Sequence, residues 1–491
     1  MSTFRRSFAG SGFSSASASS RRGAEIAGWV FLFAVSGGIY LLAAADNTWI
    51  WVPVFAGSMF LVVGLGILWD WVIQRRPLLN ARTVILCGVL YWLLLDPLLM
   101  RNGTDDFPAP VVLRGLLYAG IFLAAVWVGY LVTQPLRPLT RFFSRIPTET
   151  NDDIVFIATV AIYLISVVPL VTATSSISDL WRLLLAGYSP DVDVAWRRGM
   201  LGDSQAFLRS AARLLQLTIP FLGTYLIARR LSLWKKAVVA IMILSLFLVI
   251  FFSGERRILA LIVLGPLGYA FFSTPGKTLK KWAPAFVMLL LLLFWMMQAQ
   301  VQFRSAGFYE FDAAKVESNL LEMHRDNNFY WFTMAVDTMP STYEYTHEWI
   351  FLQIFTHPIP RFLWPEKPYS TGFPFVRWED IGASLSISVI GELYISQGVF
   401  GIVFGGLIYG WIARNWDSLR QFIRKGSATG LLYSLGLTLL LIGVRSFGDI
   451  VLNWYIMAIL IVVLRYIGVR RQGRHRSLIW PSEEGRTSLP V

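Results

Sequence analysis

Long apolar runs recur along this chain, and they constrain its fold more than any other feature. A lipid bilayer has a hydrocarbon core about 30 Å thick, so a helix needs about 20 apolar residues to cross it. Runs of about this length cover residues 24–45, 49–73, 82–100, 110–133, 154–174, 206–228, 236–253, 257–273, 282–299, 386–413, 427–446 and 450–469. The chain is 55% hydrophobic and 15% charged, a composition that is typical of an integral membrane protein. We therefore predict an all-α, polytopic membrane protein with about 12 transmembrane helices.

These runs divide the chain into five parts. The predicted order is a disordered basic tail at 1–23, transmembrane helices one to nine at 24–299, a large loop at 300–384, transmembrane helices ten to twelve at 385–469, and a second basic tail at 470–491. The first run is too long for a signal-peptide core of about 7–15 residues, so we take it as an uncleaved span. The run at 257–273 is the shortest, and a re-entrant or broken element is the alternative there.

Basic residues concentrate in alternate loops, and this bias predicts the orientation of the chain. Cytoplasmic loops carry an excess of Lys and Arg. Twelve spans with both termini in the cytoplasm satisfy this rule and place the loop at 300–384 outside, together with residues 175–205, which we expect to form a short interfacial helix. The formal charge of +13 is therefore an orientation signal, and no nucleic-acid partner is expected. The single cysteine excludes a disulfide framework.

The centre of the large loop is rich in proline. It reads His357-Pro358-Ile359-Pro360-Arg361-Phe362-Leu363-Trp364-Pro365-Glu366-Lys367-Pro368. Proline fixes φ and lacks an amide proton, so this segment cannot form a regular helix or a central strand. We predict a rigid, bent loop that presents Arg361 and Lys367 on opposite sides of Trp364.

Several arginines lie at the predicted outer ends of the spans. Arg209 and Arg213 share one helical face, the pair Arg256 and Arg257 follows Glu255, and Arg445 precedes Asp449. Lipid snorkelling and local ion pairs with Glu255 or Asp449 are the alternatives to a binding role. Guanidinium groups bind phosphate oxygens bidentately, so this convergence favours an anionic headgroup such as a polyprenyl pyrophosphate, although an ordinary phospholipid fits as well.

Glu392 is a carboxylate about two turns inside the tenth predicted span. Charged groups at membrane depth are costly and usually functional. Glu392 is therefore a candidate general base, and a helix–helix hydrogen bond or an arginine counter-ion is the alternative.

At these residues the chain resembles the bacterial oligosaccharide repeat-unit polymerases, the Wzy-type O-antigen and exopolysaccharide polymerases. The resemblance is carried by Pro358 to Pro368, by Ile390-Gly391-Glu392-Leu393-Tyr394 with Gly398-Val399-Phe400-Gly401, by Val336 to Pro340, and by Ser253-Gly254-Glu255-Arg256. It covers the second half of the chain, and the first half only by hydropathy. It implies a bacterial inner-membrane enzyme with a periplasmic active loop and a GT-C-like plan.

The implied reaction is glycosyl transfer between two lipid-linked glycans. Arginines can neutralise the leaving pyrophosphate without a metal or another cofactor, and a base takes the proton of the acceptor hydroxyl. The expected anion-binding residues are Arg361, Arg256, Arg325 and Arg445, followed by Arg213, Arg257, Arg304 and Lys367. The candidate bases are Glu392, His357 and His324, with a loop cap as the alternative for His357. Trp364 could stack on a sugar, although an interfacial aromatic belt explains it equally well.

The expected partners are the lipid-linked oligosaccharide donor and acceptor, membrane lipids, a chain-length regulator and a flippase. An O-antigen ligase, which uses the same donor, is the nearest alternative. Further alternatives are a metal-dependent GT-C enzyme that uses Asp191-Val192-Asp193, a transporter or flippase of an anionic lipid, and a non-catalytic scaffold.

Overall fold

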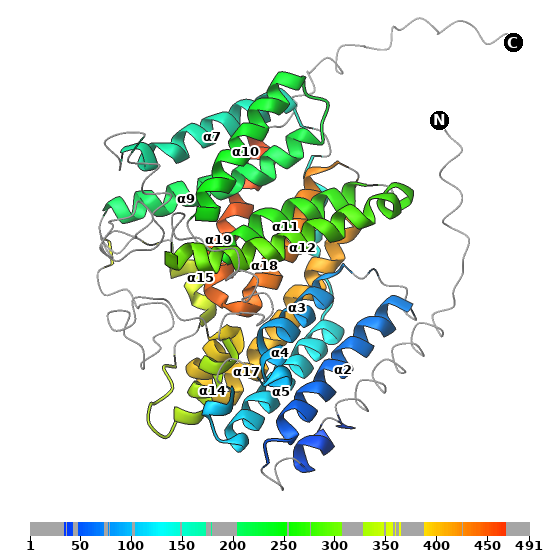
Figure 1. Cartoon of the computed structure of the whole chain (residues 1–491). Coiled ribbons are helices and arrows are strands. Elements are labelled where there is room, and N and C mark those ends of the chain that lie inside the picture. The colour runs from blue at the N-terminus through cyan, green and yellow to red at the C-terminus, as the bar shows by residue number, and fades with distance from the viewer. Residues whose placement is uncertain are drawn as a thin grey trace, which may run out of the picture.

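The structure is a computed structural model in which most of the apolar runs are helices (Figure 1). It describes residues 34–35, 37–42, 48–72, 77, 79–100, 104–147, 150–172, 178, 204–252, 255–274, 276–306, 328–347, 350–356, 359, 363–364, 387–424 and 426–467.

Nine helical segments within these ranges are long and apolar enough to cross a membrane. They are α2 (Trp51–Val72), α3 (Ala81–Val89) continued by η1 (Leu90–Leu94) and α4 (Leu95–Leu99), α5 (Ala109–Val132), α10 (Leu233–Phe252), α11 (Arg256–Ser273), α12 (Gly276–Ala306), α17 (Ser388–Ser418) continued by η4 (Leu419–Phe422), α18 (Ala428–Arg445), and α19 (Phe447–Ile461) continued by η5 (Val462–Ile467). The prediction of a polytopic helical membrane protein is confirmed at this level, while the count of twelve spans stays a prediction.

Two further helices coincide with predicted spans without belonging to these nine. They are α7 (Asp152–Thr172) and α9 (Ser204–Ile227), which pack against each other. The short run at 257–273 forms the continuous helix α11, so a broken element at this place is excluded. The helix α12 extends to Ala306, six residues beyond the predicted start of the large loop at 300.

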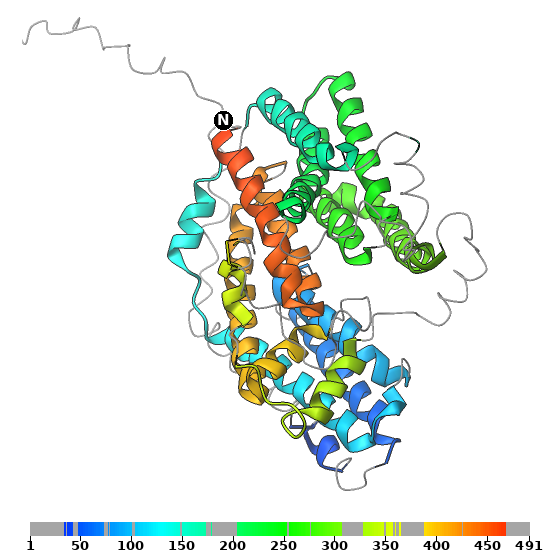
Figure 2. The same ribbon diagram turned by 90° about the vertical axis from the view of Figure 1, so that its left-hand side faces the viewer.

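The helices form two groups on either side of a central pair. One group contains α2 to α5, α14 (Asn328–Thr338) and α17, and the other contains α7 and α9 to α12, with α18 and α19 between them (Figures 1 and 2). In α18, 89% of the most apolar stretch is buried, because this helix packs against α3, α11, α17 and α19. The residues at the two ends of α18 therefore lie where both groups meet.

Glycines allow α5 and α17 to approach each other closely. A Cβ atom on Gly410 would lie 2.1 Å from the carbonyl oxygen of Val126, and one on Gly129 would lie 2.3 Å from that of Leu407. Gly406 and Gly410 form a GxxxG pattern, which is typical of closely packed membrane helices. This contact joins α17 to the N-terminal group although the two helices are far apart in the sequence.

The helix α17 is interrupted at Gln397 and Gly398, where Gly398 has φ +62°. Two backbone amides of the large loop donate hydrogen bonds to carbonyl groups beside the break. Thr346 N donates to Ile395 O at 3.0 Å, and His347 N donates to Ser396 O at 2.9 Å. At 1.5 Å per residue, the part of α17 from Gly398 onward is about 30 Å long and is sufficient to cross a bilayer by itself. The preceding turns therefore form a separate, buried element.

A half-buried carboxylate joins helix ends on the opposite side of the bundle from this break. Asp417, near the end of α17, accepts hydrogen bonds from Ala81 N at 2.7 Å, from Tyr130 Oη at 2.9 Å and from Tyr433 Oη at 3.2 Å. These donors come from α3, α5 and α18. Asp417 thus connects the central helix α18 to the group that contains α3, α5 and α17.

Candidate functional site

The corner between α18 and α19 organises a polar cluster at one end of the bundle. The helix α18 ends at Arg445, Ser446 is extended with φ −160° and ψ 137°, and α19 begins at Phe447. The Ser446 side chain accepts a hydrogen bond from Gly448 N at 3.2 Å, as serine commonly does at a helix N-cap. This tight corner places Arg445 and Asp449 beside each other.

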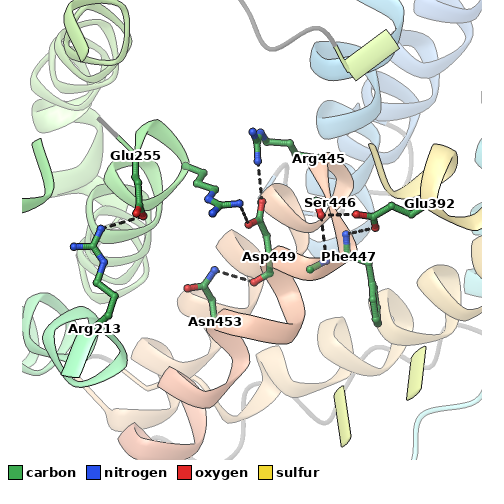
Figure 3. A network of polar contacts seen from close by, with 10 residues as sticks. Arg213, Glu255, Glu392, Arg445, Ser446, Phe447, Asp449 and Asn453 are labelled. Carbon is green, nitrogen blue, oxygen red and sulfur yellow. Dashed lines mark hydrogen bonds and ion pairs between the residues drawn. The ribbon is translucent and has the colours of Figure 1, made fainter. Parts of the chain in front are cut away.

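Asp449 is a buried carboxylate that binds two arginines. Arg257 Nη1 donates to its Oδ1 at 2.7 Å, and Arg445 Nη1 donates to its Oδ2 at 3.3 Å (Figure 3). The Asp449 side chain is only 1% exposed. The pairing of Arg445 with Asp449 was one of the alternatives from the sequence, but the same carboxylate also holds an arginine from α11, 192 residues away.

A second ion pair lies at the start of α11. Arg213 Nη2 of α9 donates to Glu255 Oε2 at 3.0 Å, so Glu255 forms an ion pair across helices (Figure 3). The side chains of Arg213, Arg257 and Arg445 are 22%, 25% and 15% exposed. Three helices, α9, α11 and α18, therefore bring partly exposed guanidinium groups to one end of the bundle.

Helix termini add to the positive character of this cluster. Arg256 and Arg257 are the first two residues of α11. The N-terminal end of a helix carries partial positive charge, so cations there are unfavourable and anions are favoured. The start of α19 contributes a second such end. This arrangement is suited to binding an anion.

Glu392 stabilises the corner from the opposite side. Its Oε1 accepts a hydrogen bond from Ser446 Oγ at 2.6 Å, and its Oε2 accepts one from Phe447 N at 2.7 Å (Figure 3). Glu392 is 5% exposed and lies in the second turn of α17. The sequence predicted a continuous span at this place, but the helix is interrupted after Glu392, at Gln397 and Gly398. Because both carboxylate oxygens are engaged, the geometry favours the helix–helix hydrogen bond over the role of a base.

Part of the large loop packs beside the same corner. Tyr455 Oη donates to Ile354 O at 2.8 Å, and the rings of Phe351 and Phe447 lie 5.0 Å apart. These contacts involve η3 (Ile350–Leu352) and α15 (Gln353–Thr356). The chain therefore runs beside the start of α19 immediately before the proline-rich motif begins at His357.

The remaining predicted site residues are placed only in part. Trp364 is half-buried. Arg304 belongs to α12 and Arg209 to α9, in stretches where the structure does not describe their side chains. His324, Arg325, His357, Arg361, Lys367 and the pair Asp191 and Asp193 lie outside the described residues.

In the part of the chain that the structure describes, no group of three or more His, Cys, Asp or Glu side chains is arranged to hold a metal ion. Two cavities among the described residues are not lined by these arginines. One is an apolar cavity between α2 and α5, lined by Phe55, Met59 and Gly120, and the other is a small one beside the break in α17, lined by Phe351, Gln397 and Phe400.

Taken together, the described helices define a polytopic membrane protein with an arginine-rich cluster where α9, α11, α18 and α19 meet. Comparison of the chain with protein-family models, with curated proteins and with solved structures found no match.

Sequence reasoning found the arginines of this cluster but not what connects them. It considered Asp449 only as a neighbour of Arg445 and assigned no role to Ser446. The sequence did contain a signal for the role of Ser446, because a serine just before an apolar run is typical of a helix N-cap. The contact between Arg257 and Asp449 carried no such signal, since the two residues are 192 positions apart.

Proposed function

We propose that this protein is a glycosyltransferase that polymerises undecaprenyl-pyrophosphate-linked oligosaccharide repeat units into O-antigen or exopolysaccharide at the periplasmic face of a bacterial inner membrane. The observation that carries the proposal is the meeting of Arg213, Arg257 and Arg445, from three helices, around Glu255 and Asp449. The sequence resemblance in the proline-rich motif and around Glu392 supports the same function.

The chemistry needs an anion site and a base. The bond between the anomeric carbon and the pyrophosphate breaks, a new bond to the acceptor hydroxyl forms, and the hydroxyl proton passes to the base. Guanidinium groups stabilise the negative charge that develops on the departing pyrophosphate. Arg257 and Arg445 are the described residues that we assign to this task, with Arg213 and Arg256 beside them. His324 and His357 are the candidates for the base.

Glu392 has a different role in this proposal. Its carboxylate fixes Ser446 and Phe447, and the corner in turn fixes Arg445 and Asp449. We therefore assign Glu392 as a positioning residue. The partners in this function are the lipid-linked donor and acceptor, membrane lipids, a flippase and a chain-length regulator.

Reconstitution tests the proposal directly. The purified protein in liposomes, supplied with a purified lipid-linked repeat unit, should give a ladder of products that differ by one repeat. Arg257→Ala and Arg445→Ala should each slow the ladder by roughly 10²–10³-fold, as expected for the loss of a group that stabilises transition-state charge. Arg141→Ala is the matched control, because Arg141 is exposed on the short helix α6 (Arg137–Ser144).

Two results would contradict the proposal. The first is a folded wild-type protein that does not extend its native repeat unit. The second is transfer of a finished glycan to a lipid A-core acceptor without any ladder, which would identify an O-antigen ligase.

A chelator separates the metal-dependent alternative. Polymerisation should persist when EDTA is added in excess over all divalent cations, because arginines supply the positive charge in the proposed mechanism. Loss of the ladder with EDTA, and its return with a divalent cation, would favour the GT-C enzyme that depends on a metal.

A further inference from the structure

The carboxylate of Asp449 lies between two arginines that the proposed function assigns to the pyrophosphate. Each of its oxygens accepts from a different guanidinium group, at 2.7 Å from Arg257 and at 3.3 Å from Arg445. Asp449 is 1% exposed, whereas the two arginine side chains are 25% and 15% exposed. The carboxylate therefore lies beneath the arginines and not in front of them.

The position of Asp449 is fixed by its own surroundings. Its backbone oxygen accepts a hydrogen bond from Asn453 Nδ2 at 2.8 Å, and Ser446 caps the start of the same helix. The two arginines, by contrast, belong to separate helices, α11 and α18. Two guanidinium groups repel each other when they approach, so a shared counter-ion is needed to hold them at a defined separation.

A guanidinium group can serve Asp449 and a ligand together. It has five N–H donors in a fixed planar fork, and Arg257 and Arg445 each use Nη1 in the hydrogen bond to Asp449. A diphosphate has two phosphoryl groups, and each can accept from one guanidinium group. If the two arginines are held at a fixed spacing, each guanidinium group can bind one of the two phosphoryl groups.

We propose that Asp449 is a positioning residue that sets the separation and orientation of Arg257 and Arg445 for a polyprenyl diphosphate headgroup. This inference rests on the proposed function, because it assigns Asp449 to the anion site of that function. Asp449 does not touch the substrate, and it acts only through the two arginines.

The opposite role for Asp449 predicts the opposite result. If its carboxylate only neutralised the arginines, the substrate would have to compete with it, and removing its charge would strengthen the binding of an anion. If Asp449 positions the arginines, removing its charge weakens binding although the site becomes more positive. The sign of the change therefore separates the two roles.

The experiment is a titration of the purified full-length protein with farnesyl pyrophosphate at constant ionic strength. Asp449→Asn keeps the size of the side chain and the backbone acceptor for Asn453, but it removes the charge. We expect the Kd for farnesyl pyrophosphate to rise by about 10-fold or more, the range typical when one partner of a supporting charge network is lost. In the polymerisation assay, the KM for the lipid-linked donor should rise in parallel.

Two further variants make the result specific. Asp417→Asn removes the charge of a half-buried carboxylate that binds the other end of α18, so it should lower the melting temperature and leave the Kd unchanged. Asn453→Ala removes the side-chain hydrogen bond to the Asp449 backbone oxygen without changing any charge, and it should raise the Kd by a smaller factor than Asp449→Asn.

Each outcome decides the inference. An unchanged or lower Kd in folded Asp449→Asn would overturn the positioning role while leaving the proposed function in place. If Asp449→Asn does not fold, Asn453→Ala decides in its place, and an unchanged Kd there would overturn the positioning role. Failure of the wild-type protein to bind farnesyl pyrophosphate would overturn both proposals.

Discussion

At the scale of single residues, Glu392 shows how a carboxylate at membrane depth can be structural. Its two oxygens accept hydrogen bonds at 2.6 Å and 2.7 Å from the first residues of the α18–α19 corner. Hydrogen bonds to a charged group contribute about 1.5–3 kcal/mol each. Both oxygens bind groups of the corner and Glu392 is 5% exposed, which is why we assign Glu392 to positioning.

Glu392→Gln and Glu392→Ala should therefore differ strongly. A glutamine can accept from Phe447 N and donate to Ser446 Oγ, so the corner stays satisfied and polymerisation should continue within about 10-fold of the wild-type rate. Alanine leaves both donors buried without Glu392, at a cost of about 1–3 kcal/mol for each donor, and should lower the melting temperature. Thermal unfolding in detergent and the ladder assay measure these two effects.

A different result for Glu392→Gln would show that Glu392 acts as the general base. In that case Glu392→Gln would keep the wild-type melting temperature and lose about 10²–10⁴-fold in rate, which is the usual contribution of a general base.

At the scale of helices, the contact between α5 and α17 depends on the absence of side chains. A Cβ atom on Gly410 would lie within 3.0 Å of three backbone atoms, on Val126, Gly129 and Tyr130. Backbone atoms cannot move aside as a flexible side chain can, so the two helices would have to separate. Close backbone approach is the main source of stability where lipid and side chains are equally apolar.

Gly410→Ala should destabilise the protein by about 1–3 kcal/mol, the usual cost of overpacking. Gly64→Ala is the matched control, because it adds the same methyl group to the exposed face of α2, where a Cβ atom would meet no other atom within 4 Å. Unfolding midpoints in a denaturing detergent compare the two variants. Equal midpoints for both would show that the contact between α5 and α17 tolerates separation.

The sequence predicted most described helices to within a few residues, since the apolar runs at 49–73 and 110–133 correspond to Trp51–Val72 and Ala109–Val132. Hydropathy alone could not show the break at Gln397 and Gly398, because the apolar composition of α17 continues across it. The short helix α6 was also missed, since its length and charge resemble those of a loop.

At the scale of the whole molecule, α18 connects two polar clusters that lie at its opposite ends. Arg445 at its C-terminal end reaches Asp449, while Tyr433 in its first half binds Asp417. Both clusters join residues more than 100 positions apart, for example Asp417 with Ala81.

Asp417→Ala should be among the most destabilising single substitutions in the chain. It would leave the amide of Ala81 and the hydroxyls of Tyr130 and Tyr433 without this acceptor, at about 1–3 kcal/mol for each buried donor. Asp153→Ala is the control, since Asp153 is 67% exposed and its ion pair with Lys235 should contribute about 0–1 kcal/mol. Similar melting temperatures for the two variants would contradict the structural role of Asp417.

Such long-range contacts mark the limit of what could be predicted from the sequence. Arg82 is 1% exposed and forms an ion pair with the buried Asp70, a partner that the apolar runs do not identify. Likewise, Arg213 was expected at a binding site, but its partner Glu255 was not identified. Composition identifies which charges are costly in a membrane, whereas the choice of partner depends on how helices distant in the sequence pack.

The close contact between α5 and α17 also has a consequence for biosynthesis. Leu136, just after α5, bonds to Asn415 of α17 across 279 residues of intervening chain. The face of α5 that α17 covers, which includes Gly129, is therefore made long before the ribosome has made α17. A nascent chain stalled before α17 would present this uncovered face to lipid and to the insertion machinery.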